Sequence, residues 1–264
     1  VAERSGSLAD HATRLLRNAK LLPAALMARL PFRDIAAQDR FAQEHNILVL
    51  EARDLDSYHH QAGAMMRIAA RARVPLAVAE DAEVVMFRAE IGGEDHFAVL
   101  IGKGADLEAP LVRLHSQCVT GDVLGSLKCD CGDQLQAAMR LMAENGGGVL
   151  IYLAQEGRDI GLLNKMRAYA LQDNGLDTVD ANHALGFDTD ERVFLPAARI
   201  LDALGITRLR LITNNPDKIS QLEQCGIKVE ERVPLVLASN PHNEDYLATK
   251  KHRTGHMIMD KDKG

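Results

Sequence analysis

The sequence lacks several features that would point to particular classes of protein. No apolar run approaches the roughly 18 residues that a membrane-spanning helix requires, and the N-terminal residues do not resemble a secretory signal. The formal net charge is -6, so the overall charge favours neither nucleic acid nor anionic membrane as a partner. Only four cysteines occur, and three of them lie in one short segment, which favours metal binding in a reducing compartment over a disulfide framework. We therefore expect a cytoplasmic protein with no nucleic-acid and no membrane partner.

The remaining composition is that of a folded globular protein. With 264 residues and 47% hydrophobic content, the chain can bury a proper core. That length suits one large domain, or one domain with a smaller appendage. Because the chain begins at Val1 rather than at methionine, we expect either a trimmed N-terminus or further residues before Val1.

The N-terminal part of the chain, residues 1–75, predicts a small helical or mixed appendage. Residues 7–30 carry apolar side chains at helical spacing and predict a helix that is broken or kinked at Pro23. Residues 35–45 predict a second helix, residues 46–52 a buried strand and residues 55–74 a third helix. The appendage should end near Val74-Pro75, because proline disfavours helix in the residue before it.

Residues 76–264 predict an α/β domain. Two period-two segments, 82–93 and 94–103, meet at Gly92-Gly93 and predict a hairpin. Beyond them, strand-like and helical segments alternate, which is typical of an α/β domain with an at least partly parallel sheet. The predicted strands are 111–116, 147–154, 208–213 and 227–237, and the predicted helices are 131–145, 162–175, 193–205 and 215–226.

Three cysteines form the most informative cluster in the chain. Cys118 is followed after ten residues by Cys129-Asp-Cys131, and glycines in the loop between them would help the chain to turn. Thiolates are good zinc ligands, and three of them leave one tetrahedral position open for a water molecule. Spacing alone leaves three alternatives: an open catalytic site, a closed structural site with His115 as fourth ligand, and ordinary core cysteines.

Two predicted strands run directly into polar segments. The strand 147–154 leads into Gln155-Glu156-Gly157-Arg158-Asp159-Ile160-Gly161, and ligands of α/β sheets bind beyond the carboxyl ends of strands. Arg158 could clamp a phosphate through two hydrogen bonds; the alternative is a solvated loop before a helix. The strand 208–213 leads to Thr213 and Lys218, which could contact phosphate or ribose, or could merely flank a helix start at Asn215-Pro216.

A third polar segment, residues 182–192, is predicted to be a loop. An aspartate there could act as a general base near a metal-bound water. Alternatively Asp188, Asp190 and Glu191 could be surface carboxylates that cap the following helix, and His183 a hydrogen-bonded loop residue.

In combination and in this order, the motifs resemble the GTP cyclohydrolase II family. The resemblance is dense from about residue 76 to 258 and is carried by RLHSQCVTGDVLGSLKCDCGDQL, QEGRDIGLLNKMRAYALQDNGLDTVDANHALGF, DERVF, LITNNPDK and ERVPLVLASNPHNEDYLATKKHRTGHM. It implies a three-layer α/β domain with a mixed sheet, here preceded by an N-terminal extension over residues 1–75.

The resemblance also implies roles for individual residues. Cys118, Cys129 and Cys131 would hold one zinc ion per subunit, whose open position takes the water that attacks C8 of guanine. The family's proposed base falls on Asp190, and its proposed nucleophile toward the α-phosphate falls on Arg192. Because arginine is normally too basic to be a nucleophile, a purely electrostatic Arg192 fits the sequence equally well.

The implied nucleotide contacts lie in all three polar regions. A carboxylate such as Glu156 suits guanine, because it can accept hydrogen bonds from both N1–H and the 2-amino group. Tyr169 matches a position that lines the family's site, and magnesium is expected on the triphosphate. The implied GTP-binding residues are Arg113, Leu114, His115, Ser116, Gln117, Gln134, Glu156, Gly157, Arg158, Thr178, Thr213 and Lys218.

The implied reaction converts GTP to 2,5-diamino-6-(5-phosphoribosylamino)pyrimidin-4(3H)-one, formate and diphosphate, which is the first committed step of riboflavin biosynthesis, in a homodimer. Two alternatives remain: a variant that stops at the formylated intermediate, and a GTP-binding regulator that has lost catalysis. The family often has Glu at the position of Gln117, which changes the charge beside the metal. Some relatives carry a fused dihydroxybutanone phosphate synthase, for which the segment 1–75 is too short.

Overall fold

The computed structural model describes residues 6–90, 93–235, 237, 241, 253 and 257. By its internal contacts the chain divides into two compact units, residues 1–59 and residues 60–264. None of the described helices is both long and apolar enough to cross a lipid bilayer.

Over its described residues, 6–59, the first unit contains two short helices and the start of a third. Helix α1 (Leu8–Asn18) begins at Ser7, whose hydroxyl accepts a hydrogen bond from the Asp10 amide, and α2 (Ile35–Glu44) begins at Asp34 in the same way. Helix α3 spans Ala52–Ala64. The predicted helix over residues 7–30 is therefore shorter than expected, because it ends before it reaches Pro23.

The predicted buried strand at residues 46–52 is wrong. Residues 47–50 have no regular structure and their side chains are exposed, Leu48 by 98%. A buried strand needs hydrogen-bonded neighbours, and no described strand pairs with this segment.

The predicted third helix is wrong in its second half, which is a strand of the sheet. Strand β1 (Met66–Arg73) pairs antiparallel with β2 (Glu83–Ala89), from Met66 opposite Ala89 to Arg73 opposite Glu83. The alanine-rich segment favours helix by propensity, but pairing overrides it, and an irregularity between Ile68 and Ala70 breaks the alternation that would mark a strand. The sheet thus begins ten residues before position 76.

The second unit is built on one seven-stranded mixed sheet with the order β1-β2-β3-β5-β4-β6-β7. Strand β2 pairs antiparallel with β3 (His96–Gly102), which confirms the predicted hairpin; of its turn, Gly92 lies outside the described residues. Strand β3 pairs antiparallel with β5 (Gly147–Leu153). The parallel part contains β5, β4 (Leu111–Ser116), β6 (Arg208–Ile212) and β7 (Lys228–Val233).

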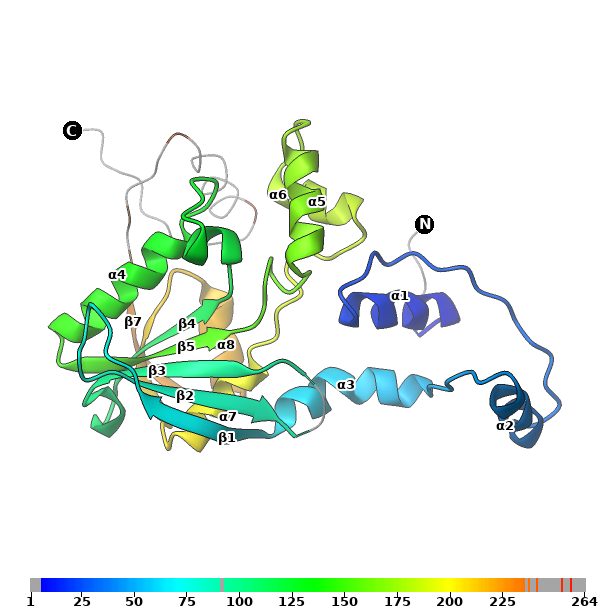
Figure 1. The fold of residues 1–264 in the computed structure, drawn as a ribbon, viewed down its shortest axis with the longest axis horizontal. Coiled ribbons are helices and arrows are strands. Elements are labelled where there is room, and N and C mark those ends of the chain that lie inside the picture. The colour runs from blue at the N-terminus through cyan, green and yellow to red at the C-terminus, as the bar shows by residue number, and fades with distance from the viewer. Residues whose placement is uncertain are drawn as a thin grey trace. The chain divides into compact units, whose positions relative to one another are not determined.

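Helices cover both faces of this sheet, which confirms the three-layer α/β architecture (Figure 1). Along β5, Val149, Ile151 and Leu153 belong to the buried cluster formed with α7 (Leu195–Ala203) and α8 (Pro216–Gln224). The alternate residue Leu150 belongs to a second cluster, with Met139 and Met142 of α4 (Cys131–Glu144). Because successive side chains of β5 are buried on opposite faces, β5 lies in the centre of the second unit's sheet.

The carboxyl ends of β4 and β5 lie at the same edge of the sheet because the strands are parallel. A π-helical turn (Val119–Val123) follows β4, and α5 (Leu162–Gln172) and α6 (Thr178–Ala184) follow β5. A short 3₁₀ turn, Gly104–Asp106, connects β3 to β4. Asn182 and His183 are thus helical rather than part of the predicted loop. Most of the predicted C-terminal motif, residues 231–257, lies outside the described residues beyond position 235.

Candidate active site

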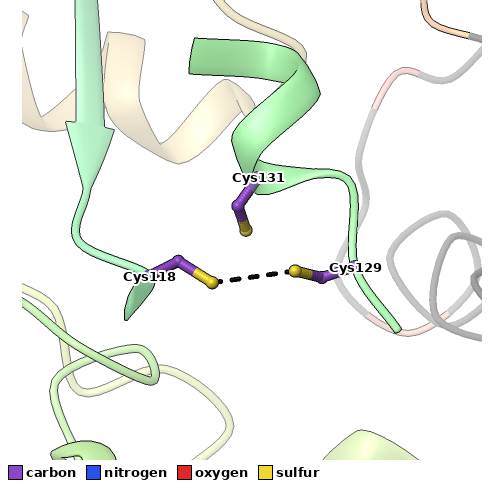
Figure 2. A group of neighbouring side chains, drawn as sticks. All are labelled: Cys118, Cys129 and Cys131. Atoms are coloured by element: carbon purple, nitrogen blue, oxygen red, sulfur yellow. Dashed lines mark hydrogen bonds between the residues drawn. The ribbon is translucent and has the colours of Figure 1, made fainter. Parts of the chain in front are cut away.

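The three clustered cysteines converge beyond the end of β4. Cys118 follows that strand, Cys131 is the first residue of α4, and Cys129 lies in the loop just before the helix (Figure 2). Their sulfur atoms lie within 4.8 Å of one another, and the Cys118 and Cys129 sulfurs are 3.7 Å apart. A disulfide would need about 2.05 Å, so these are separate thiols.

The geometry of these thiols fits a zinc ion. Tetrahedral zinc with Zn–S bonds of about 2.3 Å places its sulfurs about 3.8 Å apart, which matches the 3.7 Å separation. Gly121 packs against all three cysteines: a Cβ there would lie 2.9 Å from the Cys129 sulfur and 3.2 Å from the Cys118 sulfur. The loop therefore keeps space for the thiolates that a side chain would take.

His115 is not brought to the cysteines, so the closed Cys3His alternative is not supported. Its Nε2 lies 3.0 Å from the Asp122 carboxylate, and its ring is buried. Burial lowers the pKa of His115 although Asp122 opposes the shift. Asp122 also accepts hydrogen bonds from the Cys118 amide (3.0 Å) and the Tyr152 hydroxyl (2.8 Å). This buried carboxylate fixes the turn that carries Cys118.

The Cys118 sulfur receives two further hydrogen bonds. Lys165 Nζ donates to it at 3.0 Å and the Gly121 amide at 3.3 Å. Hydrogen bonds from Cys129 and Cys131, reinforced by Lys165, hold the pKa of Cys118 well below its usual range. The group is thus poised to be a thiolate, the form that binds metal.

Glu156 lies beside the cysteines with both carboxylate oxygens engaged. Oε1 accepts a hydrogen bond from Lys165 Nζ (2.8 Å) and Oε2 accepts one from the Val119 amide (2.7 Å). Burial lowers the pKa of Lys165, but the bonds to Glu156 and Cys118 outweigh burial and raise it overall. Burial also raises the pKa of Tyr169, four residues further along α5, so its hydroxyl stays protonated at neutral pH.

The loop after β5 has an unusual backbone. Gly157, Arg158 and Asp159 have φ values of 66°, 61° and 74°, and the left-handed region is costly for the last two. Arg158 Nη1 donates to the Thr189 carbonyl at 3.1 Å, so the loop is tied to the segment that carries Asp190. Strained backbone persists only where the surrounding structure holds it in place, and such residues are often found at active sites and ligand-binding sites.

Asp190 and Arg192 form a two-hydrogen-bond ion pair. Arg192 Nε donates to Asp190 Oδ1 at 2.8 Å and Nη2 to Oδ2 at 2.5 Å. Burial raises the pKa of Asp190, but Arg192 outweighs burial and the pKa is lowered overall. Arg192 Nη1 also donates to the Ser116 hydroxyl (3.3 Å), which in turn donates to Gln155 Oε1 (3.2 Å). The ion pair is thus linked to the ends of both β4 and β5.

Thr213 and Lys218 lie where β6 ends and α8 begins. Asn215 caps α8 and Pro216 is its first residue, so the helix-start interpretation is confirmed. Lys218 is nonetheless buried, with Nζ 2.7 Å from the Leu114 carbonyl and 5.3 Å from the centre of the Phe194 ring. Thr213 is also buried, and its hydroxyl accepts a hydrogen bond from the Asn215 amide.

Several predicted nucleotide contacts are engaged with the protein itself. Leu114 is part of the core, and its carbonyl oxygen accepts a hydrogen bond from Lys218. Arg113 is buried, which lowers its pKa to about 10. It donates to the Ile212 carbonyl and to Gln134, whose amide donates to Asp130 between two of the cysteines. The backbone N–H of Gln117 donates to the backbone carbonyl of Leu153. Thr178 is the first residue of α6.

Lys165 links Glu156 and the Tyr169 ring to the cysteines. Ser116 instead contacts Arg192, and His115 and Leu114 are buried. Sequence reasoning did not assign Lys165 and Asp122, although both contact Cys118. From the sequence alone, Lys165 is one residue on the polar face of a predicted helix, and Asp122 is one residue of a loop. They are distinguished by burial, Lys165 beside anionic groups and Asp122 among hydrogen-bond donors, and burial becomes visible only in the folded chain.

Together the fold and the cluster define an α/β protein with three cysteine thiols at the carboxyl edge of its sheet that could hold a metal ion. Residues 66–234 match the family model described as GTP cyclohydrolase II. The chain belongs to the GTP cyclohydrolase II family.

Similarity to individual proteins extends over most of the chain. It is 51% identical over 253 residues to a GTP cyclohydrolase-2 from Azospirillum brasilense, covering 96% of this chain and 66% of that protein. It is 42% identical to riboflavin biosynthesis protein RibBA from Salinispora tropica, covering 98% of this chain and 66% of that protein. The chain thus spans slightly less than two thirds of these relatives. A shorter GTP cyclohydrolase-2 from Shigella boydii is 54% identical over 166 residues, which cover 63% of this chain and 85% of that protein.

These comparisons correct the predicted N-terminal extension. The family match starts at residue 66, and 96% coverage by the Azospirillum relative includes most of the residues before it. Most of residues 1–65 are therefore shared with a longer relative, and the predicted extension over residues 1–75 is not supported. Among solved structures, a two-domain 3,4-dihydroxy-2-butanone 4-phosphate synthase from A. baumannii aligns with a TM-score of 0.39 and 19% identity over 80% of this chain and 51% of that one. A similarity this weak carries no inference.

Proposed function

We propose that this protein hydrolyses GTP to 2,5-diamino-6-(5-phosphoribosylamino)pyrimidin-4(3H)-one, formate and diphosphate, the first committed step of riboflavin biosynthesis. The observation that carries the proposal is the meeting of three elements at one edge of the sheet. The cysteine thiols, the Glu156 loop and the Asp190–Arg192 pair are joined there by hydrogen bonds through Lys165, Val119 and Ser116.

In this proposal Cys118, Cys129 and Cys131 hold one zinc ion. Bound zinc would supply a Lewis acid that makes water nucleophilic near neutral pH, and the target is C8 of guanine. Asp190 serves as the general base, since its lowered pKa keeps it ionised at neutral pH. Tyr169 lines the same site with a protonated hydroxyl that can donate a hydrogen bond.

For Arg192 the geometry favours the electrostatic role over the nucleophilic one. A guanidinium that donates two hydrogen bonds to Asp190 is a cation, and a cation has no free lone pair for attack on phosphorus. We infer that Arg192 stabilises negative charge on the α-phosphate, and that the phosphate competes with Asp190 for its N–H groups.

Guanine would be read by Glu156. Each carboxylate oxygen can accept more than one hydrogen bond, so Glu156 can keep Lys165 and Val119 while it accepts from N1–H and the 2-amino group. The triphosphate would lie toward Arg158, Lys218 and Thr213, with magnesium neutralising part of its charge. The other proposed contacts are Arg113 to Gln117, Gln134, Gly157 and Thr178.

The direct test is to incubate the zinc-loaded protein with GTP and magnesium and to quantify every product. We expect formate and diphosphate in equal amounts, together with the diaminopyrimidine identified by mass. Release of diphosphate without formate would instead identify the variant that stops at the formylated intermediate. Binding of GTP without either product would identify a regulator.

Three further parts of the proposal concern the protein's context. We propose a homodimer, which sedimentation of the intact protein would test. We propose a cytoplasmic location, because closely spaced thiols remain reduced in that compartment. Residues 76–264 were predicted to be the catalytic domain; we now propose that this domain starts near residue 60, and residues 1–59 have no assigned role.

A further inference from the structure

Lys165 is a buried cation that none of the roles above requires. It lies in the first half of α5, and only 8% of its surface is exposed. Its ammonium has three hydrogen-bonding partners: the Cys118 sulfur at 3.0 Å, the Thr120 hydroxyl at 2.8 Å and Glu156 Oε1 at 2.8 Å. An ammonium has three N–H groups, so these partners account for all of its donors.

The contacts of Lys165 are part of a closed ring of hydrogen bonds beside Cys118. Glu156 Oε2 accepts a hydrogen bond from the Val119 amide, and Val119 directly follows Cys118 in the chain. The ring therefore runs from the Cys118 sulfur through Lys165 and Glu156 back to the backbone beside Cys118. A displacement of any member changes the geometry of the others.

The charges in this ring depend on one another. Cys118 as a thiolate and Glu156 as a carboxylate are two anions in a buried region, and Lys165 is the cation that hydrogen-bonds to both. Removing one partner of a buried ion pair is strongly unfavourable, because the remaining charge has no compensation. Hydrogen bonds to metal-bound thiolates also orient the ligand and tune the metal, which is typical of residues just outside the coordination sphere.

We propose that Lys165 is a positioning residue that couples the metal ligand Cys118 to the base-reading carboxylate Glu156, so that metal affinity and guanine selectivity depend on the same ammonium. The part that concerns guanine rests on the proposed function. The part that concerns the metal rests only on the contact between Lys165 and Cys118.

The test compares Lys165→Met, which keeps length and removes charge, with Arg167→Met, which removes an exposed cation from the same helix. Zinc affinity is measured by chelator competition, and the sulfur-to-metal charge-transfer band is recorded after substitution with cobalt(II). Selectivity is the ratio of kcat/KM for GTP to that for ITP, which lacks the 2-amino group. In Lys165→Met we expect zinc affinity and the GTP/ITP ratio each to fall about tenfold or more, with a shifted cobalt band. Arg167→Met should resemble the wild type.

A second variant, Glu156→Gln, keeps the shape of the side chain and removes its charge. Since Glu156 shares Lys165 with Cys118, we expect this change to weaken zinc binding several-fold and to shift the cobalt band. Unchanged zinc binding in Glu156→Gln overturns the coupling even where Lys165→Met does not fold. Equal behaviour of Lys165→Met and Arg167→Met overturns it as well, as does a loss of selectivity with unaltered zinc affinity. A wild type that forms no formate from GTP refutes the proposed function, while the zinc and cobalt measurements still decide the role of Lys165 toward Cys118.

Discussion

Arg192 donates two hydrogen bonds to Asp190, at 2.8 and 2.5 Å, so the two residues for which separate chemical roles were predicted are partners. An ion pair of this kind keeps the base ionised and the guanidinium charged. The two residues are also coupled, because a substrate that binds one of them must weaken the hydrogen bonds between Arg192 and Asp190.

Asp190→Asn tests this relationship. The amide cannot act as a base, and it holds Arg192 less firmly, so we expect kcat for formate release to fall by about 10²–10⁴. Diphosphate release should fall less, because Arg192 keeps its charge. The neighbouring change Asp188→Asn provides the control and should leave both rates within about twofold of the wild type. Equal loss of both products would show that Asp190 serves the phosphoryl step as well.

Cys129→Ser should abolish ring opening and lower the zinc content, because serine is a poor ligand for a site built from thiolates. Zinc is measured by mass spectrometry of the purified protein and formate by enzymatic assay. Cys225→Ala is the matched control, since Cys225 lies at the end of α8 outside the cluster. Formate release by a zinc-free Cys129→Ser protein would refute the role of the metal.

Gly121→Ala should lower zinc affinity at least tenfold, since its Cβ would lie 2.9 Å from the Cys129 sulfur and 3.0 Å from the Cys131 Cβ. Gly125→Ala changes the same loop at a position with φ of 65° and open space around it. Gly125→Ala should lower the free energy of unfolding by about 1 kcal/mol through backbone strain, and its added methyl group does not contact the thiols. If both variants bind zinc equally well, close packing of Gly121 does not matter to the site.

His115 predicts a pH dependence of stability. Its folded pKa lies below the ordinary value of 6.5, because burial disfavours the charged ring. Below pH 6.5 the unfolded chain therefore gains a proton that the folded chain does not, and stability falls as the pH falls. Between pH 7.5 and 5.5 we expect the wild type to lose about 1 kcal/mol more than His115→Gln, measured by urea unfolding of the zinc-free proteins. Identical losses would mean that His115 does not titrate in this way.

Two N-terminal deletions test the proposed domain boundary. Removal of residues 1–59 should leave the second unit folded, whereas removal of residues 1–75 also deletes β1 and exposes the edge of β2. We expect the longer deletion to aggregate, because an unpaired strand edge invites association. Turnover and sedimentation of both proteins provide the measurement. Comparable behaviour would mean that β1 contributes little to the domain.

The sequence allowed the α/β class, the hairpin and most strands after residue 110 to be predicted, because their periodicity and turn residues act locally. The prediction was wrong for β1, because its alanines favour helix and an irregularity in its pairing interrupts the strand pattern. It was also wrong for residues 47–50, because this apolar segment has no described strand to pair with. The cysteine cluster was visible because its members are close in sequence. Lys165 and Asp122 were not assigned, since their importance depends on burial beside residues far along the chain.

The closeness of the three cysteines in sequence also bears on folding. Only ten residues separate Cys118 from Cys129, so the loop that joins the ligands costs little entropy to close even in an unfolded chain. Metal can therefore bind before the sheet is complete, and a ligand that also binds the unfolded chain stabilises the native state less than its affinity suggests. Full native affinity should appear only when α5 docks and Lys165, 47 residues beyond Cys118, reaches the sulfur. Zinc would then report two successive stages of folding, first capture by the loop and later tightening by the helix.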